Sequence, residues 1–411
     1  MNRCGGMRLF FSMAAVSLSA AFLVGGYEFA RIAAATVFMD AYGSSRMPYA
    51  LSAVPAAMLA AVYLYARVLS ARGPMRAMLL SMAASAVFFA AVYLCIPSKG
   101  HPGLRLAPAA FYLFTEVYIV LLVEQYWSFI NSTLNPASAK LYNGPITGGA
   151  AIGPALSDWF IKTYASSLGT EQLILLAAAA ILPAAVLIWL SYRLAGEPRP
   201  SETETGAAGG HLHLSLIREN RTLLLLMCAI FLSQMVATAL NLKLYEVVEN
   251  SISGRDARSA FIGSVLMYAN ISSGILQFVL APALLRFVPY AAIMAAIPAL
   301  HLATAASVAL HPTLYTAAFA LGAFKSLDYS IFRAAKELIY VPLSYDARYR
   351  AKQIVDGVTY RFSKGATAVS LSAWRALTGA AGPYSLIAVC AAGLWLAVSV
   401  PLGRRAAGQL E

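Results

Sequence analysis

Long apolar stretches separated by short polar segments recur along the whole chain. Twelve of them are long enough for a membrane helix, because about 20 apolar helical residues cross a bilayer core of about 30 Å. The predicted spans are residues 8–41, 47–68, 75–96, 104–131, 139–165, 172–195, 221–249, 258–287, 289–310, 313–342, 348–376 and 383–403. Their continuous apolar character predicts an all-α polytopic membrane protein and not a transmembrane barrel, whose strands alternate in segments of about ten residues. The first span is too long and too apolar for a cleaved signal peptide.

The longest polar stretch, residues 196–220, divides the spans six plus six. Its Pro, Gly, Ser and Glu content indicates a flexible linker. We therefore predict an N-terminal six-helix bundle over 1–195, a cytoplasmic linker over 196–220 and a C-terminal six-helix bundle over 221–411. Two six-helix halves are the major facilitator arrangement, in which the substrate site lies near the bilayer midplane between the halves.

Composition agrees with a membrane location. The chain is 60% hydrophobic and only 12% charged, whereas soluble domains carry about 25% charged residues. A net charge of +12 would suggest nucleic acid for a soluble protein, but the basic residues here lie mostly between the spans. Their bias toward one side predicts that both termini are cytoplasmic. We expect the lipid bilayer, and no nucleic acid, as the macromolecular surroundings.

Candidate chemistry of other classes is sparse. The four cysteines lie far apart without a CxxC pair, which predicts free thiols and no zinc site. The five histidines are scattered, whereas a polytopic membrane enzyme would need clustered His, Asp or Cys. The chain has no GxxxxGK[ST] loop for nucleotide hydrolysis. We therefore expect a protein that is not an enzyme and that has no cofactor or metal.

The loop between the second and third spans reads "ARVLSARGPMR". It resembles the major facilitator loop signature, in which a small residue, an acid, an Arg, a Gly and a basic residue follow one another with fixed spacing. Arg72, Gly73 and Arg76 fit, but Ala71 stands where the acid is expected. An ordinary basic cytoplasmic loop is the alternative.

Charged residues inside the spans are the most informative positions. Each costs at least about 2.5–3.5 kcal/mol near the bilayer centre, so those that persist face the interior, pair or line a path. Glu28 and Arg31 are three residues apart on one helix face and are expected to pair. They face a substrate cavity or, alternatively, fix the first span to a neighbour. Glu124 lies deep in the fourth span beside Trp127, whose ring either stacks on a flat substrate or packs between helices.

The C-terminal half repeats the pattern. Lys243 with Glu246, and Lys325 with Asp328, have the same three-residue spacing and are expected to pair. Lys336 or Arg333 is expected to reach Asp356 and so to build a cytoplasmic gate, with a permanent clamp as the alternative. Acidic and basic residues are about equally frequent in the spans, whereas a carrier of free polyphosphate is expected to show a basic surplus.

At these residues the sequence resembles the ATP/ADP translocases of plastids and obligate intracellular bacteria. Four segments share positions with that family, and the segment from Lys336 to Gly365 is the most specific. The shared positions are Arg31, Thr36 and Gly43; Trp127, Phe129, Asn131, Ala139, Lys140 and Gly149; Phe261, Gly263 and Gly274; and Lys336, Glu337, Tyr340, Pro342, Leu343, Lys352, Asp356, Arg361, Lys364 and Gly365. Ala34 and Ala35 replace the family's Lys and Asp, and that Lys is implied to meet phosphate.

The resemblance implies a secondary transporter of the bacterial inner membrane that exchanges ATP for ADP by alternating access. The alternative is a major facilitator-type carrier of a nucleoside, organic anion, peptide or lipid-like metabolite, with a proton as coupling ion. We expect a monomer. The residues predicted to line the pathway are Glu28, Arg31, Glu124, Trp127, Asn131, Lys243, Lys325 and Asp328, and those predicted to form the gate are Lys336, Glu337, Asp356 and Arg361.

Overall fold

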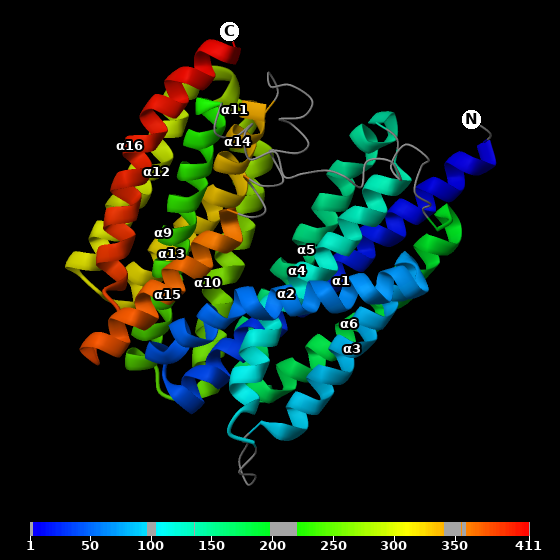
Figure 1. Cartoon of the computed structure of the whole chain (residues 1–411), viewed down its shortest axis with the longest axis horizontal. Helices are drawn as coiled ribbons and strands as arrows, with labels where there is room; N and C mark the ends of the chain where they lie inside the picture. Colours follow the sequence, from blue (N-terminus) through cyan, green and yellow to red (C-terminus); the bar gives the residue numbers. More distant parts are fainter. Residues whose placement is uncertain are drawn as a thin grey trace. The chain divides into compact units, whose positions relative to one another are not determined.

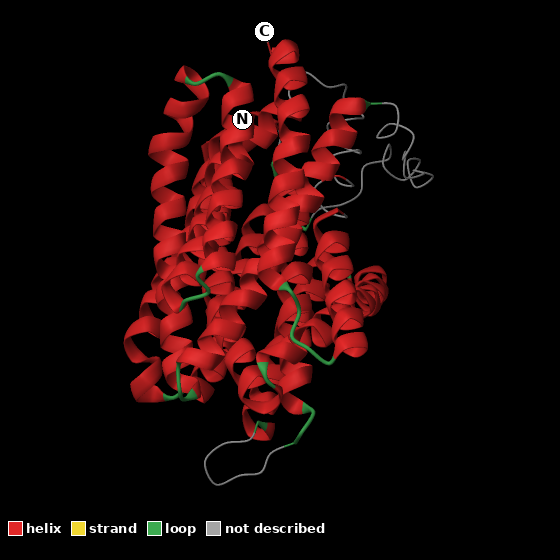
Figure 2. Cartoon of the chain, turned by 90° about the vertical axis from the view of Figure 1, so that its left-hand side faces the viewer, coloured by secondary structure: helices red, strands yellow, loops and turns green. Residues whose placement is uncertain are grey.

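The computed structural model describes residues 3–96, 104–134, 136–197, 220–340, 355 and 359–410. Helices make up nearly all of these residues, joined by short loops, and no strand occurs among them (Figure 2). The first part of the chain forms α1 (Arg3–Tyr42), the short 3₁₀ turn η1 (Ser44–Arg46), α2 (Met47–Arg72), α3 (Pro74–Cys95), α4 (Ala107–Thr133), α5 (Pro136–Leu168) and α6 (Thr170–Ala195).

The remainder of the chain forms a second series of helices. It contains α9 (Arg221–Ser251), α10 (Arg255–Ile275), the π-helical turn η3 (Leu276–Leu280), α11 (Ala281–Phe287), α12 (Tyr290–Leu310), α13 (Leu314–Leu327), the π-helical turn η4 (Asp328–Phe332), α14 (Arg333–Tyr340), α15 (Thr359–Thr378) and α16 (Tyr384–Leu410). Figure 1 follows this order by colour, from α1 in blue to α16 in red.

These helices confirm the predicted all-α class, and within the described residues they follow the predicted spans; residues 348–354 and 356–358 of the eleventh span lie outside the described residues. Nine helices of the described residues are long and apolar enough to cross a membrane. The other three predicted spans are helical as well: α5, the run from α13 to α14, and α15. They fall short on apolarity because they carry the glycines, hydroxyls and charges that drew attention in the sequence.

Contacts divide the chain into two compact units. Unit 1 contains Met1–Gly43, Ala56–Glu202 and Ser253–Met267. Here α1 packs along α5 and α6 and also contacts α4, while α3 contacts α4 and α6. The aromatic core of unit 1 includes Phe89 and Phe111, which are fully buried with their rings edge to face at 5.9 Å.

Unit 2 contains Ser44–Pro55, Thr203–Ile252 and Tyr268–Glu411. In this unit α9 and α12 pack against α16, and α9 also contacts α13 and α15. Trp395 of α16 is fully buried, with its ring stacked on His301 of α12 at 5.5 Å.

Each unit includes one short segment that lies far from the rest of it in sequence. In unit 2 that segment is Ser44–Pro55, which contains η1 and the start of α2. Within η1, the Ser44 amide donates to Glu249 Oε2 at 2.7 Å, and Arg375 Nη1 donates to the Ser45 carbonyl at 3.0 Å. In unit 1 it is the start of α10, whose polar contacts form one of the sites described next.

Candidate functional site

The middle of α1 carries a buried ion pair. Glu28 and Arg31 form the predicted salt bridge, and the Glu28 residue is only 5% exposed. The Arg31 guanidinium also lies over the Tyr27 ring, with 5.4 Å from its carbon to the ring centroid. A carboxylate removed from water needs such a partner, because the desolvation of an unpaired charge is expensive.

Two glycines bring α1 and α5 into close contact at this level. A Cβ on Gly153 would lie 2.0 Å from the Ala21 carbonyl oxygen, and one on Gly25 would lie 2.9 Å from Ser157 Oγ. Larger side chains at these positions would therefore force the two helices apart. Small residues at a crossing allow the same close approach in other membrane helix pairs.

Asp158 of α5 is fully buried, and the sequence analysis did not include it among the site residues. It follows Ser157, which touches the Gly25 position, and precedes Phe160, whose ring meets Phe29 of α1 at 5.8 Å. Its carboxylate is therefore level with Glu28 and Arg31. Helical spacing could have indicated its burial, because Asp158 shares one face of α5 with the apolar residues Ile161 and Ala165, which are also fully buried.

In α4 the buried face differs from the one that Glu124 and Trp127 occupy. Glu124 is exposed and Trp127 is half-buried. Gln125 and Tyr126 are buried instead: Gln125 Nε2 donates to Ser81 Oγ at 3.3 Å, and the Tyr126 hydroxyl bonds to Ser19 of α1. The side chain of the predicted pathway residue Asn131 lies outside the described residues.

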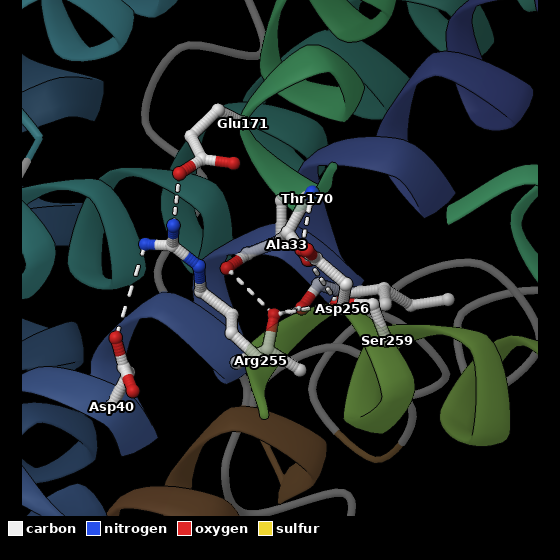
Figure 3. A network of polar contacts seen from close by, with 9 residues as sticks. Ala33, Asp40, Thr170, Glu171, Arg255, Asp256 and Ser259 are labelled. Atoms are coloured by element: carbon white, nitrogen blue, oxygen red, sulfur yellow. Dashed lines mark hydrogen bonds and ion pairs between the residues drawn. The ribbon is translucent and has the colours of Figure 1, made fainter. Parts of the chain in front are cut away.

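A polar network holds the start of α10 to the ends of α1 and α6. Figure 3 shows the Arg255 guanidinium between the carboxylates of Glu171 and Asp40; it pairs with Glu171 directly and lies 3.9 Å from Asp40. Sequence reasoning did not identify this three-way contact, because its members come from three separate helices.

A second group of contacts continues the network (Figure 3). Asp256 Oδ1 accepts hydrogen bonds from the amide and the hydroxyl of Thr170, both at 2.7 Å. The Thr170 hydroxyl lies 2.9 Å from Ser259 Oγ, which lies 2.9 Å from Thr36 Oγ1 of α1. Thr170 is the first residue of α6 and Gly169 before it has no side chain to cap the helix, so Asp256 supplies the cap from α10.

In unit 2 the predicted pair of α9 is present. Lys243 Nζ lies 2.6 Å from Glu246 Oε2, and both side chains are largely buried. The pair occupies the turn of α9 that follows the buried residues Gln234 and Thr238.

The richest group of charges lies where α13 passes through η4 into α14. Asp328 opens η4 and is half-buried. The positive charges that act on it are those of Lys325, Arg333 and Lys336. Lys325, its predicted partner, has its ammonium 5.7 Å from the Tyr329 ring centroid. The Tyr290 hydroxyl donates to the Ala335 carbonyl at 2.8 Å and so fixes the turn that carries Lys336.

The four predicted gate residues are described only in part. Lys336 is half-buried, Glu337 is exposed on α14, and Arg361 is exposed on α15. Asp356 lies outside the described residues. No group of three or more potential metal ligands occurs in the described ranges.

Part of the second unit is similar in sequence to a known transporter family. Residues 283–400 match the TLC ATP/ADP transporter family. No curated protein matches the sequence significantly.

Solved structures share the whole fold at low sequence identity. A bacterial homologue of the human lysosomal transporter Spinster is 12% identical with a TM-score of 0.60, over 98% of this chain and 96% of that one. The nucleoside transporter NupG is 13% identical with a TM-score of 0.56, over 98% of each chain. A bacterial homologue of the iron transporter ferroportin reaches a TM-score of 0.64 at 11% identity, over 95% of this chain and 98% of that one.

Proposed function

We propose that this protein is a secondary membrane transporter of the major facilitator fold and that its substrate is a phosphorylated nucleotide. Exchange of ADP for ATP is the first activity to test. The observation that carries the proposal is that the family match and a group of cations lie in the same part of the chain. The match to the TLC ATP/ADP transporter family covers residues 283–400, and the cation group around Asp328 lies inside that range.

The chemistry of this group suits phosphate. Lys325, Arg333 and Lys336 provide three cations around one carboxylate, a local basic surplus that the average over all spans conceals. Ammonium and guanidinium groups hold phosphate oxygens through charge-assisted hydrogen bonds. The group also sits on a π-helical turn, a feature that is frequent at functional sites.

A binding cycle follows from these charges. The substrate phosphate competes with the Asp328 carboxylate for the surrounding cations, so that binding changes the pairing within the group. The substrate therefore stabilises the conformation in which these cations are free to bind phosphate. A ligand shifts a pre-existing equilibrium toward the conformation that it binds better. We assign Glu28, Arg31, Glu124, Trp127, Asn131, Lys243, Lys325 and Asp328 to the pathway, and Lys336, Glu337, Asp356 and Arg361 to the gate.

Energy comes from exchange or from an ion gradient in this proposal, since the sequence has no nucleotide-hydrolysing loop. Glu28, Glu124 and Asp328 are the candidate carriers of a coupling proton. The protein works as a monomer in a bacterial inner membrane, with both termini in the cytoplasm and the linker 196–220 between a first half, 1–195, and a second half, 221–411.

One observation favours a second candidate, a carrier of a nucleoside or another small solute. Ala34 and Ala35 occupy the positions of the family's Lys and Asp, and both are buried at 1% exposure. The first helix therefore offers no cation at these two positions, and one phosphate contact implied by the resemblance is missing.

Exchange in proteoliposomes tests the proposal. Vesicles loaded with unlabelled ADP should take up labelled ATP or ADP, and ADP should raise the thermal stability of the purified protein. Lys325→Gln and Lys336→Gln should each reduce uptake about 10- to 100-fold, because a hydrogen bond to a charged group contributes roughly 1.5–3 kcal/mol. Arg286→Gln, an exposed position on α11, is the matched control and should transport normally.

Nucleotide exchange is rejected if labelled ADP does not enter and ADP leaves thermal stability unchanged. Uptake of nucleosides in the same vesicles, with Lys325→Gln as active as the parent, would establish the second candidate.

A further inference from the structure

Four arginines gather at one end of unit 1, outside the transport site. Arg67 and Arg72 lie at the end of α2, Arg76 lies in the first turn of α3, and Arg193 lies in the last turn of α6. All four residues are exposed. None forms an ion pair within the part of the chain that the structure describes.

These helix ends lie together. The Met75 amide at the start of α3 donates to Glu197 Oε1, beyond the end of α6, at 3.1 Å. Gly73, in the turn between α2 and α3, has φ +78°, and a Cβ there would lie 2.9 Å from the same oxygen. Glu197 follows Gly196, which ends α6, so these contacts bring the end of α6 to the turn between α2 and α3.

The charge of the group is strongly positive. Glu197 is the one acidic residue near this end in α2, α3 and α6 or directly after them, since Glu171 stands at the opposite end of α6. Its carboxylate caps the first turn of α3, a favourable place for an anion. Four guanidinium groups against one carboxylate leave a surplus of positive charge.

Two of the arginines are stacked on exposed aromatic rings. The Arg67 guanidinium lies 5.4 Å from the centroid of the Tyr63 ring, and that of Arg193 lies 5.3 Å from the Trp189 ring. Tyr63 is 60% exposed and Trp189 is 41% exposed. In both helices the aromatic residue precedes its arginine by one turn. Tyr and Trp with an apolar body and a polar tip mark the headgroup level of a bilayer, so the stacking sets both cations at that level.

We propose that this group, Arg67, Arg72, Arg76 and Arg193, binds the headgroup of an anionic phospholipid. A guanidinium group is a planar donor that binds phosphate oxygens in pairs. Basic side chains at the membrane surface are attracted to anionic lipids, and clusters of them recognise anionic headgroups. The exposed rings of Tyr63 and Trp189 offer an apolar surface for the glycerol and upper acyl chains of the same lipid.

A lipid titration of the purified full-length protein tests the site. Phosphatidylglycerol, added to detergent micelles, should raise the Tm, and phosphatidylcholine should not. Arg67→Gln/Arg193→Gln should bind phosphatidylglycerol about 30-fold more weakly, since two cations near an anionic surface contribute about 2 kcal/mol. Without added lipid its Tm should equal that of the parent, because both side chains are exposed.

Arg404→Gln/Arg405→Gln is the matched control. It removes the same charge from exposed positions of α16 in unit 2 and should keep the full response. An equal loss of response in this control would show general electrostatic attraction and would overturn the site. A response to phosphatidylcholine would also overturn it, and so would an equal shift with soluble glycerol phosphate, which would make the ligand a free phosphate ester.

Discussion

Glu28 and Arg31 show how a charge is kept inside a helix bundle. The two side chains neutralise each other within one turn of α1, and the Tyr27 ring covers one face of the guanidinium. Either charge alone would face a low-dielectric interior without its nearest compensation, which is more expensive than the intact pair. The pair is therefore better tested by removing both charges than by removing one.

We expect Arg31→Gln alone to destabilise the protein by about 3–5 kcal/mol, because it leaves the buried Glu28 carboxylate without this partner. The double change Glu28→Gln/Arg31→Gln should recover most of that loss. Thermal unfolding in detergent measures both, and substrate uptake measures function separately. If the double variant is stable and transports normally, the pair is structural and does not belong to the pathway.

Close approach of α1 and α5 gives a second prediction for a single residue. Gly153→Ala would place a Cβ 2.0 Å from the Ala21 carbonyl oxygen, and backbone cannot yield as a flexible side chain would. Overpacking of this kind costs typically about 1–3 kcal/mol. The Tm should fall accordingly.

Gly393→Ala on α16 is the control for that substitution. No atom lies within 4 Å of a Cβ at this position, so the alanine should leave stability unchanged or raise it slightly by favouring the helix. Equal effects of the two substitutions would contradict the close contact of α1 with α5.

Two helix starts in unit 1, those of α3 and α6, are capped by carboxylates from distant segments. Gly73 and Gly169 precede α3 and α6 with φ near +78° and +91°, and neither has a side chain that could cap the helix. Glu197 caps α3 and Asp256 caps α6. Near the end of α2, Ala71 replaces the acid of the expected signature. Glu197, which lies beyond the end of α6, provides a carboxylate near the same turn.

Two substitutions of Asp256 distinguish its hydrogen bonds to the start of α6 from its negative charge. Asp256→Ala removes the acceptor of the Thr170 amide and hydroxyl and should cost about 0.5–2 kcal/mol. Asp256→Asn keeps an acceptor oxygen and should cost less. Hydrogen exchange at the first turn of α6 should accelerate in the alanine variant and stay near the parent rate in the asparagine variant. Unchanged exchange in both would exclude this cap.

At the scale of the whole molecule, the two units are built from interrupted stretches of sequence. The start of α2 belongs to unit 2 and the start of α10 belongs to unit 1. The contacts of Ser44 with Glu249, and of Arg255 with Glu171, account for these assignments. A substitution that loosens the start of α2 should therefore destabilise unit 2, and one that loosens the start of α10 should destabilise unit 1.

The orientation of the chain in the membrane can be tested with reporter fusions. The excess of Lys and Arg in alternate loops predicts that both termini lie in the cytoplasm. A fluorescent protein that matures only in the cytoplasm should fluoresce when fused after Glu411, and alkaline phosphatase should be active when fused at Gly100. The reverse pattern, with activity of the phosphatase at the C-terminus, would refute this orientation.

Residues close together in sequence were predictable in detail. In the described residues, the helical segments follow the predicted spans because the free energy of burying apolar residues in a bilayer is set locally, about 20 residues at a time. The pairs Glu28–Arg31 and Lys243–Glu246 follow from helical spacing alone. The π-helical turn at Asp328 was not predictable, since it changes the helix repeat exactly where charges are dense.

The class of the protein, the place of its helical segments and the pairs within one turn could be predicted from the amino-acid order, because each depends on neighbours along the chain. The packing of the helices, by contrast, sets that Gln125 and Tyr126 of α4 are buried within unit 1 while Glu124 is exposed, and that Asp158 is fully buried. It also sets that Arg255 joins Glu171 across 84 residues and that Glu197 caps α3 across 122. Such contacts depend on which helix faces meet, and this is settled by the fit of side chains such as those around Gly25 and Gly153 and not by hydrophobicity along the chain.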